Sequence, residues 1–140
     1  MEQCLEEENK IVITNKIYYN EGEEYMLNRQ RIKNVDTAYI PRKKIGNYLL
    51  NPEHRDNQGK AKLLNSIGYT LKNKSKLKRD ILKGIKNNKA EFQCNTKQGE
   101  KYKVEIELGL TKKIMFISIW IVDGKDTRFV TIKPKQRGGK

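Results

Sequence analysis

Apolar and polar residues alternate most regularly in the C-terminal third of the chain. From Tyr102 to Leu108 every second residue is apolar, and the residues between them are lysines or glutamates. A period of two is typical of a strand with one buried face. The almost wholly apolar run Ile114–Val122 instead suits a central strand covered on both faces.

Two further segments, Ala90–Asn95 and Thr127–Lys133, also have the composition of strands. Polar residues between Asn95 and Gly99, and again from Asp123 to Asp126, predict the turns that connect neighbouring strands. The four strands are therefore expected to form an antiparallel meander.

Three short helical segments precede the strands, each with apolar residues at helical spacing. They are expected at Pro41–Asn51, Lys60–Ile67 and Ser75–Asn87. The apolar set of the first helix is Ile45, Tyr48, Leu49 and Leu50. Pro41 suits a helix start, Ser75 an N-cap, and Gly68 the left-handed cap that ends the second helix. Helices followed by strands predict an α+β fold, with N-terminal helices packed on a C-terminal antiparallel sheet of about four strands.

Charge divides the chain into two parts. Residues 1–40 contain five Lys/Arg and eight Asp/Glu, a net charge of −3, whereas residues 41–140 contain twenty-five and nine, a net charge of +16. We therefore distinguish an acidic lead-in or linker, 1–39, whose structure is left open, from a basic domain, 40–140. A field of this size attracts polyanions, and each cation that neutralises a phosphate adds a salt-dependent contribution to binding. Nucleic acid, RNA above all, is the expected partner, and a basic surface without any partner is the alternative.

The sequence lacks the motifs of several well-known kinds of catalytic or binding site. The sequence has no glycine-rich phosphate loop, no G-x-S-x-G elbow and no His/Cys metal set, so a nuclease here is expected to need neither a metal nor another cofactor. No apolar run is long enough for a membrane-spanning helix, so we expect no membrane anchor. The two cysteines, Cys4 and Cys94, form no C-x-x-C motif, and their scarcity favours thiols over a disulfide.

His54 is the single histidine, and it lies in the polar loop between the first two helices. RNA cleavage needs a base for the 2′-hydroxyl, an acid for the 5′-oxygen and cations for the charged phosphorane, and His54 can serve as the base or the acid. Lys60 and Lys62 follow in the next helix, where positions i and i+2 point in different directions, so only one of them is expected to face the site. A solvated surface histidine is the alternative.

Four residues in the last two strands carry polar or aromatic groups that could join this site: Trp120, Arg128, Thr131 and Lys133. In a regular strand Thr131 and Lys133 share one face and Arg128 lies on the other. Arg128 and Thr131 can therefore serve one site only if the strand twists or bulges. Trp120 is either a core residue or a platform on which a base stacks.

Parts of the sequence resemble a family of bacterial toxin domains with a Leu-Leu-Asn-Pro-x-His string. The similar segments are Ile40–Ile45, Tyr48–His54, Gly59–Lys62, Gly68–Tyr69, Trp120–Gly124 and Arg128–Thr131. The resemblance covers about residues 40–133, and Thr127 stands where the family often has proline. Such domains form the C-termini of large polymorphic toxins, including contact-dependent inhibition toxins, and are similar to the superfamily of barnase, EndoU, colicin E5 and the RelE toxins.

The resemblance implies a metal-independent ribonuclease, often aimed at tRNA, that is exported as part of a larger toxin and acts in the target-cell cytoplasm. It also implies an acidic cognate immunity protein, leaves open whether a host protein activates the enzyme, and makes residues 1–39 a delivery or linker segment. The recurring polar positions of the family match His54, Lys60, Arg128 and Thr131, which are the expected catalytic residues. The expected substrate-binding residues are Lys62, Arg55, Trp120 and Lys133.

Two other functions are consistent with the sequence. A non-catalytic nucleic-acid-binding module of phage or bacterial origin would bind RNA without cutting it, and its histidine would be incidental. A domain whose basic surface meets only an acidic protein would bind RNA weakly and with little dependence on salt.

Overall fold

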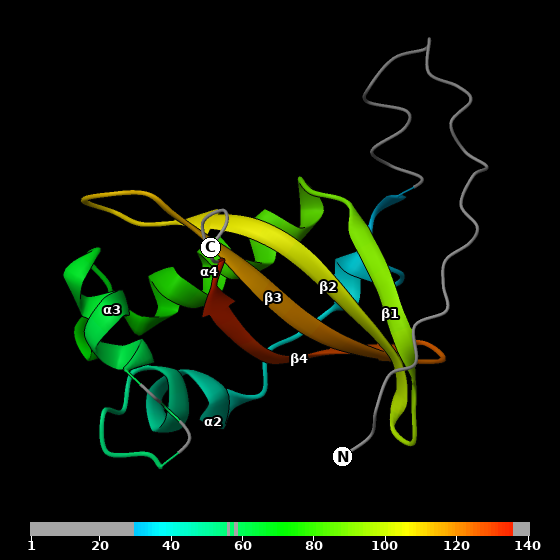
Figure 1. Cartoon of the computed structure of the whole chain (residues 1–140), viewed down its shortest axis with the longest axis horizontal. Helices are drawn as coiled ribbons and strands as arrows, with labels where there is room; N and C mark the ends of the chain where they lie inside the picture. Colours follow the sequence, from blue (N-terminus) through cyan, green and yellow to red (C-terminus); the bar gives the residue numbers. More distant parts are fainter. Residues whose placement is uncertain (1–29, 56, 58, 136–140) are drawn as a thin grey trace, which may run out of the picture.

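The computed structural model describes residues 30–55, 57 and 59–135. Its helical elements are η2 (Val35–Thr37), α2 (Arg42–Lys44), η3 (Ile45–Leu49), α3 (Lys60–Ser66), η4 (Leu71–Asn73) and α4 (Lys74–Lys86). Its strands are β1 (Ala90–Thr96), β2 (Gly99–Leu108), β3 (Ile114–Asp123) and β4 (Asp126–Pro134). Helices precede one four-stranded antiparallel sheet of order β1-β2-β3-β4 (Figure 1), so the predicted α+β fold is confirmed.

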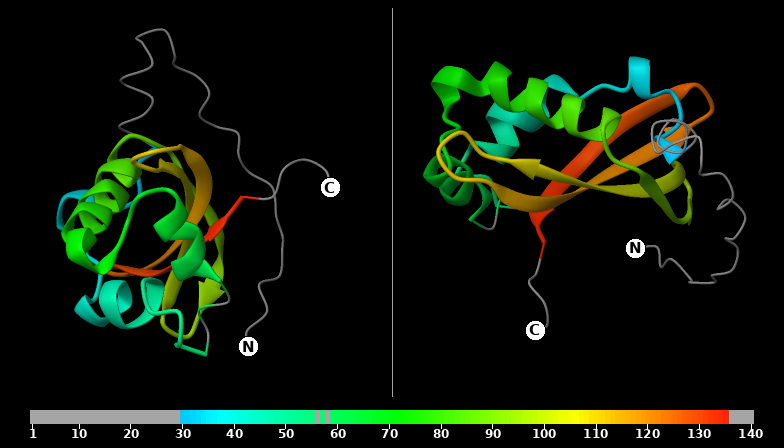
Figure 2. Two further views of the ribbon diagram at one scale, coloured as in Figure 1. Left: turned by 90° about the vertical axis from the view of Figure 1, so that its left-hand side faces the viewer. Right: turned by 90° about the horizontal axis from the view of Figure 1, so that it is seen from above.

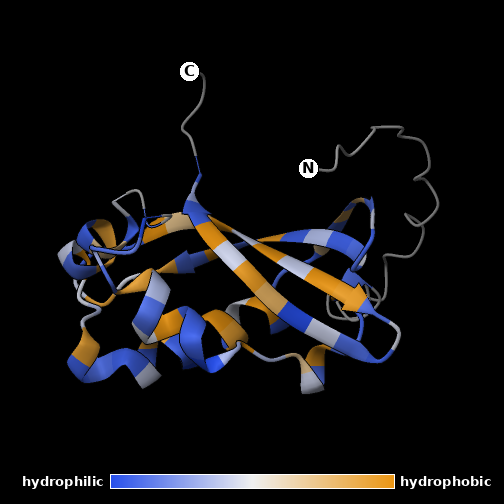
Figure 3. Cartoon of the chain, turned by 90° about the horizontal axis from the view of Figure 1, so that it is seen from below, coloured by the Kyte–Doolittle hydropathy of each residue, from blue (hydrophilic) through white to orange (hydrophobic). Residues whose placement is uncertain are grey.

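The sheet buries one face under the helices and leaves the other partly open. Figure 2 shows the sheet twisted and curled, with α4 lying along one face, and in Figure 3 the strands carry alternating hydrophobic and hydrophilic bands. The alternation predicted for β2 is confirmed, because Val104, Ile106 and Leu108 are buried. On β3 the residues Ile117 and Ile119 are only half-buried, so this strand is not fully covered on both faces as its sequence had suggested.

The three predicted helices are present, with changes at their ends. The first consists of the single α-helical turn α2 followed by the π-helical turn η3. The second, α3, is followed by Gly68 at φ +110°, a conformation that glycine adopts without steric cost. The third is preceded by η4, whose capping box pairs Thr70 with Asn73. Ser75 therefore lies inside α4 and is not its N-cap. The N-cap of α4 is Asn73, and Thr70 caps the preceding turn η4.

The segment before α2 belongs to the folded domain. Ile32 is 2% exposed and is part of the hydrophobic core. Tyr39 exchanges two backbone hydrogen bonds with β4, donating to Thr127 at 3.1 Å and accepting from Phe129 at 3.0 Å. The Thr127 hydroxyl also donates to the carbonyl of Lys33 at 2.8 Å. The folded unit therefore begins earlier than residue 40, and this anchoring sets α2 beside β4.

A β-bulge interrupts the pairing of β4 with β3. Trp120 pairs with Phe129 but Ile119 pairs with Thr131, so Val130 is the extra residue. Paired residues lie on the same face of a sheet, and Ile121 pairs with Arg128. The bulge therefore brings Arg128 and Thr131 to the same open face, which the regular alternation of the sequence would have forbidden.

The sequence also led to expectations about membrane-spanning helices and about the two cysteines. Within the described residues, no helix is both long enough and apolar enough to cross a membrane. Cys94 on β1 is 6% exposed and takes part in a disulfide, contrary to the expected thiol. Cys4, like the rest of the acidic lead-in before residue 30, lies outside the described residues.

Candidate active site

Three of the four expected catalytic residues meet around one phenol, that of Tyr48. Lys60 Nζ donates to Tyr48 Oη at 2.6 Å and to Thr131 Oγ1 at 3.0 Å. Tyr48 Oη and Thr131 Oγ1 are 2.9 Å apart. The His54 ring packs edge-on against the Tyr48 ring, with the ring centroids 5.1 Å apart. These four residues, named here the Tyr48 cluster, combine a phenol, an imidazole, an ammonium and a hydroxyl.

The four residues of the cluster come from four different segments of the fold. Tyr48 comes from η3, His54 from the loop that follows it, Lys60 from the first turn of α3, and Thr131 from β4 directly after the bulge. Tyr48 and Lys60 are 12 positions apart, with His54 between them, whereas Thr131 is 71 positions beyond Lys60. Thr131 therefore meets the other three only in the folded domain. None of the four is fully buried, so the cluster can be reached from solvent.

The side chain of Asn57 connects the loop that carries His54 to the helical segments on both sides of it. Its side chain is 1% exposed and donates to the carbonyls of Tyr48 and Leu49, while its Oδ1 accepts from the Ala61 backbone N–H at 2.8 Å. One amide thus joins the end of η3 to the start of α3. This joint fixes the distance between Tyr48 and Lys60.

Two lysines act on the ionisation of Tyr48. The Nζ atoms of Lys44 and Lys60 lie 5.3 Å and 5.1 Å from the centroid of its ring. Burial alone raises the pKa of Tyr48, but hydrogen bonds to Lys60 and Thr131, together with the charges of Lys60 and Lys44, lower that pKa below its usual value of 10.0. The phenol is therefore a better proton donor than an ordinary tyrosine.

A basic cleft of about 870 Å³ opens beside the Tyr48 cluster, on the open face of the sheet. Its lining includes four cations and no acid, and the half-buried Ile119 forms part of its apolar wall. The four cations are Lys44, Lys97, Lys101 and Arg128. Lys44 connects the cleft to the cluster because it lines the cleft and also lies over the Tyr48 ring.

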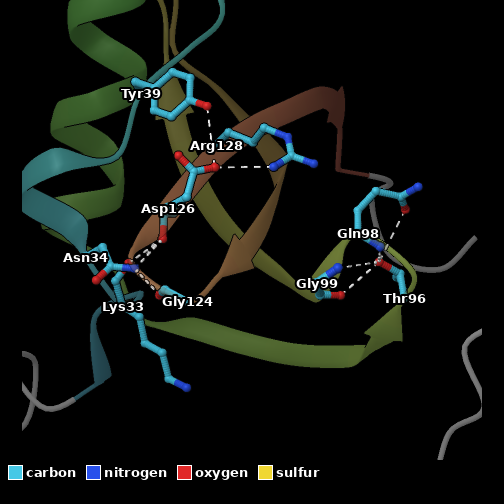
Figure 4. A network of polar contacts seen from close by, with 10 residues as sticks. Lys33, Asn34, Tyr39, Thr96, Gln98, Gly99, Gly124, Asp126 and Arg128 are labelled. Atoms are coloured by element: carbon cyan, nitrogen blue, oxygen red, sulfur yellow. Dashed lines mark hydrogen bonds and ion pairs between the residues drawn. The ribbon is translucent and has the colours of Figure 1, made fainter.

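Arg128 is held at the wall of this cleft by a carboxylate. Its Nη1 lies 3.3 Å from Asp126 Oδ2, which also accepts from Tyr39 Oη at 3.4 Å (Figure 4). Figure 4 shows the guanidinium between β4 and the β1–β2 hairpin, where Thr96 and Gln98 line the same cleft. The Arg128 side chain remains 30% exposed, so donors are left for an anion in the cleft.

The structure separates the expected site residues into two groups. It brings His54, Lys60 and Thr131 together and places Arg128 in the adjoining cleft. Of Lys60 and Lys62, only Lys60 joins the Tyr48 cluster, as predicted. Lys62, Arg55 and Lys133 are exposed.

Trp120 requires a correction. It is 0% exposed, its indole N–H donates to Ser118 Oγ at 2.9 Å, and its ring packs edge-on against Phe129 at 5.3 Å. A base could stack on Trp120 only if the core opened. Trp120 is therefore a core residue, because its position on β3 faces the helices.

Three residues of the site were not predicted from the sequence: Tyr48, Lys44 and Asn57. Tyr48 was assigned to the apolar stripe of the first helix, although a phenol at the edge of such a stripe can turn its hydroxyl outward. Lys44 is one of many lysines in the basic domain, and Asn57 lies in the polar loop after Pro52. A buried asparagine in a tight loop gives no local signal other than its preference for turns.

Within the described part of the chain there is no group of three or more His, Cys, Asp or Glu residues that could hold a metal ion. The model of a family described as a domain of unknown function, DUF6883, matches residues 31–136. This range agrees with the folded unit, which includes Ile32 and the backbone bridge between Tyr39 and β4. The comparisons with curated proteins and with solved structures found no match.

Proposed function

The chain belongs to the DUF6883 family, and we propose that its domain is a metal-independent ribonuclease. One observation carries the proposal: proton-transfer groups and a cation meet in the Tyr48 cluster, directly beside a cleft lined by cations. An RNA strand in the cleft would place a phosphate near Arg128 and Lys44. The neighbouring ribose would then lie within reach of the cluster.

The proposed reaction is transfer of the phosphoryl group to the adjacent 2′-hydroxyl. His54 accepts the proton of that hydroxyl as its oxygen attacks phosphorus, and the bond from phosphorus to the 5′-oxygen breaks. The leaving 5′-oxygen takes a proton from Tyr48, whose lowered pKa suits the role of acid. The products are a 2′,3′-cyclic phosphate and a 5′-hydroxyl.

Cations stabilise the dianionic phosphorane in this scheme. Lys60 donates into the cluster and Arg128 lines the cleft, so each can approach a non-bridging oxygen. Fixed donors aimed at developing charge commonly provide a large share of the rate enhancement of an enzyme. Thr131 positions Tyr48 and Lys60 through its hydroxyl. No step of this scheme needs a metal ion.

The biological setting is part of the same proposal. We propose that tRNA is the substrate, that the domain acts in the cytoplasm of a target bacterium after export as part of a larger toxin, and that an acidic immunity protein inhibits it. The cationic cleft supports an acidic inhibitor, because opposite charges steer association and add specificity. A non-catalytic RNA-binding module would use the same cleft but would leave RNA intact.

Chemically modified RNA tests the proposed reaction. The purified domain should cleave an RNA in excess EDTA and leave 2′,3′-cyclic phosphate ends, whereas a fully 2′-O-methylated copy of that RNA should stay intact. Glu53→Ala, which changes an exposed neighbour of His54, should cleave at the wild-type rate. Cleavage of the methylated RNA, or a requirement for Mg²⁺, would contradict the proposed reaction.

A further inference from the structure

A second basic recess, of about 440 Å³, lies on the other side of the helical turn α2. It is lined by four cations, Arg42 and Lys43 from α2 and Lys74 and Lys78 from α4, together with Gly46 and Ile45 of η3. All four cations are exposed. A methyl group placed on Gly46 would lie 3.8 Å from Lys74 Nζ, so this ammonium sits directly over the backbone of η3.

The charges of this recess, named here the α2–α4 recess, are not neutralised by the domain. Its lining contains no acid, and among the described residues none of its four cations takes part in an ion pair, whereas the neighbouring Lys76 pairs with Asp80 at 3.2 Å. Lys74 and Lys78 are spaced i, i+4 on one helix, and like charges at that spacing repel each other and destabilise a helix. An anion bound between them would remove this repulsion.

The recess and the cleft lie on the two sides of the same chain segment. Lys44 lines the cleft, while the two preceding residues line the recess. A helix with its side chains is about 10 Å across, so the two groups of cations are separated by little more than that. One folded polyanion can reach both.

We propose that the α2–α4 recess is a second RNA-binding site, which holds phosphates of the substrate away from the bond that is cleaved. The choice of RNA as the ligand rests on the proposed function. The recess contains no proton-transfer group of the Tyr48 cluster, so it contributes affinity and not chemistry. Its use requires an RNA that is long or folded enough to lie across α2, and a short oligonucleotide bound in the cleft leaves it empty.

The test compares two double variants that remove the same charge. Lys74→Gln with Lys78→Gln changes the recess, and Lys83→Gln with Lys86→Gln changes exposed lysines at the far end of α4. Binding is measured by fluorescence anisotropy at several salt concentrations, using a folded RNA of tRNA size and a short unstructured oligonucleotide. Thermal unfolding checks that both variants fold.

The recess variant should bind the folded RNA about 25- to 60-fold more weakly at about 0.1 M salt, because each phosphate contact contributes about 0.7 (single strand) to 0.9 (duplex) to the salt slope. The slope of log K against log salt should fall by about 1.4 to 1.8. The control variant should lose less than about threefold, and the short oligonucleotide should bind both variants almost equally.

Each remaining outcome has one meaning. Equal loss of RNA affinity in both double variants would overturn the recess as an RNA site. Binding to polyglutamate is measured as well. A recess variant that binds folded RNA normally but loses affinity for polyglutamate would also overturn the proposal, and would identify an acidic protein as the ligand. If the wild type binds RNA through the recess but cleaves none, the proposed ribonuclease fails and the second binding site stands.

Discussion

At the scale of single residues, the central feature of the molecule is one phenol between two ammonium groups. Tyr48 accepts a hydrogen bond from Lys60 and lies under Lys44. In a solvated site these contacts would have little effect, but the phenol is partly buried, so the charges act on it more strongly. The arrangement makes Tyr48 an acid and brings it into contact with His54, the other group that can move a proton.

Tyr48→Phe should lower kcat by on the order of 10²-fold, the lower end of what a general acid contributes. An acid must be protonated to act, so wild-type activity should fall as pH rises through the lowered pKa of Tyr48. The variant should lack this alkaline decline. Tyr102→Phe, a change on β2 outside the cluster, is the matched control and should keep both the rate and the pH profile, as measured by single-turnover cleavage. An unchanged rate in Tyr48→Phe would remove Tyr48 from the mechanism.

Tyr102 makes the stability of the fold depend on alkaline pH. Burial, followed by the charge and hydrogen bond of Glu100, raises the pKa of Tyr102 to about 12 from 10.0. The unfolded chain therefore loses this proton at lower pH than the folded domain, and stability should fall as pH rises from about 10 to about 12. Urea unfolding at pH 8 to 11.5 should show a shallower decline in Tyr102→Phe. An identical decline in both proteins would contradict this account.

At the scale of elements, the geometry of the site depends on joints between segments. Asn57 connects η3 to α3, and the backbone hydrogen bonds of Tyr39 connect the segment before α2 to β4. The bulge at Val130 then turns Thr131 to the same face as Arg128. The side-chain amide of Asn57 makes the first connection, whereas backbone hydrogen bonds of Tyr39 make the second. The site is therefore assembled by the fold.

Asn57→Ala should destabilise the domain by about 1–3 kcal/mol, because the carbonyls of Tyr48 and Leu49 and the N–H of Ala61 would lose a buried partner. Cleavage should fall as well, since Tyr48 and Lys60 would no longer be held together. Asn65→Ala, on the exposed side of α3, should change the free energy of unfolding by less than about 0.5 kcal/mol. Chemical denaturation measures the free energy of unfolding of both variants. Equal losses of stability would show that Asn57 does not connect η3 to α3.

Some of these elements could be predicted from the sequence and others could not. Period-two alternation identified the buried face of β2, and Pro41 and Gly68 marked a helix start and a helix end, because these signals are local. The bulge at Val130 has no such signal, since it depends on how β4 registers against β3. The resemblance to the toxin family implied one site made of His54, Lys60, Arg128 and Thr131. The fold shows that three of these residues surround Tyr48, which the sequence did not single out.

At the scale of the whole molecule, the sheet separates packing from polar chemistry. One face holds the core under α4, and this is where Trp120 lies. The other face carries the cleft with Lys101 and Arg128. The chain has a net charge of +13, and the cleft and the α2–α4 recess each gather four cations without an acid in their lining. Such a distribution favours a polyanionic partner.

The ribonuclease activity is tested first by incubating total bacterial RNA with the purified domain in excess EDTA, beside His54→Ala, and resolving the RNA on a denaturing gel. If His54 is the base of a metal-independent ribonuclease, the wild type gives discrete fragments, His54→Ala leaves the RNA intact, and both proteins bind RNA with nearly equal affinity. Intact RNA with the wild type, or full activity of His54→Ala, would contradict this mechanism.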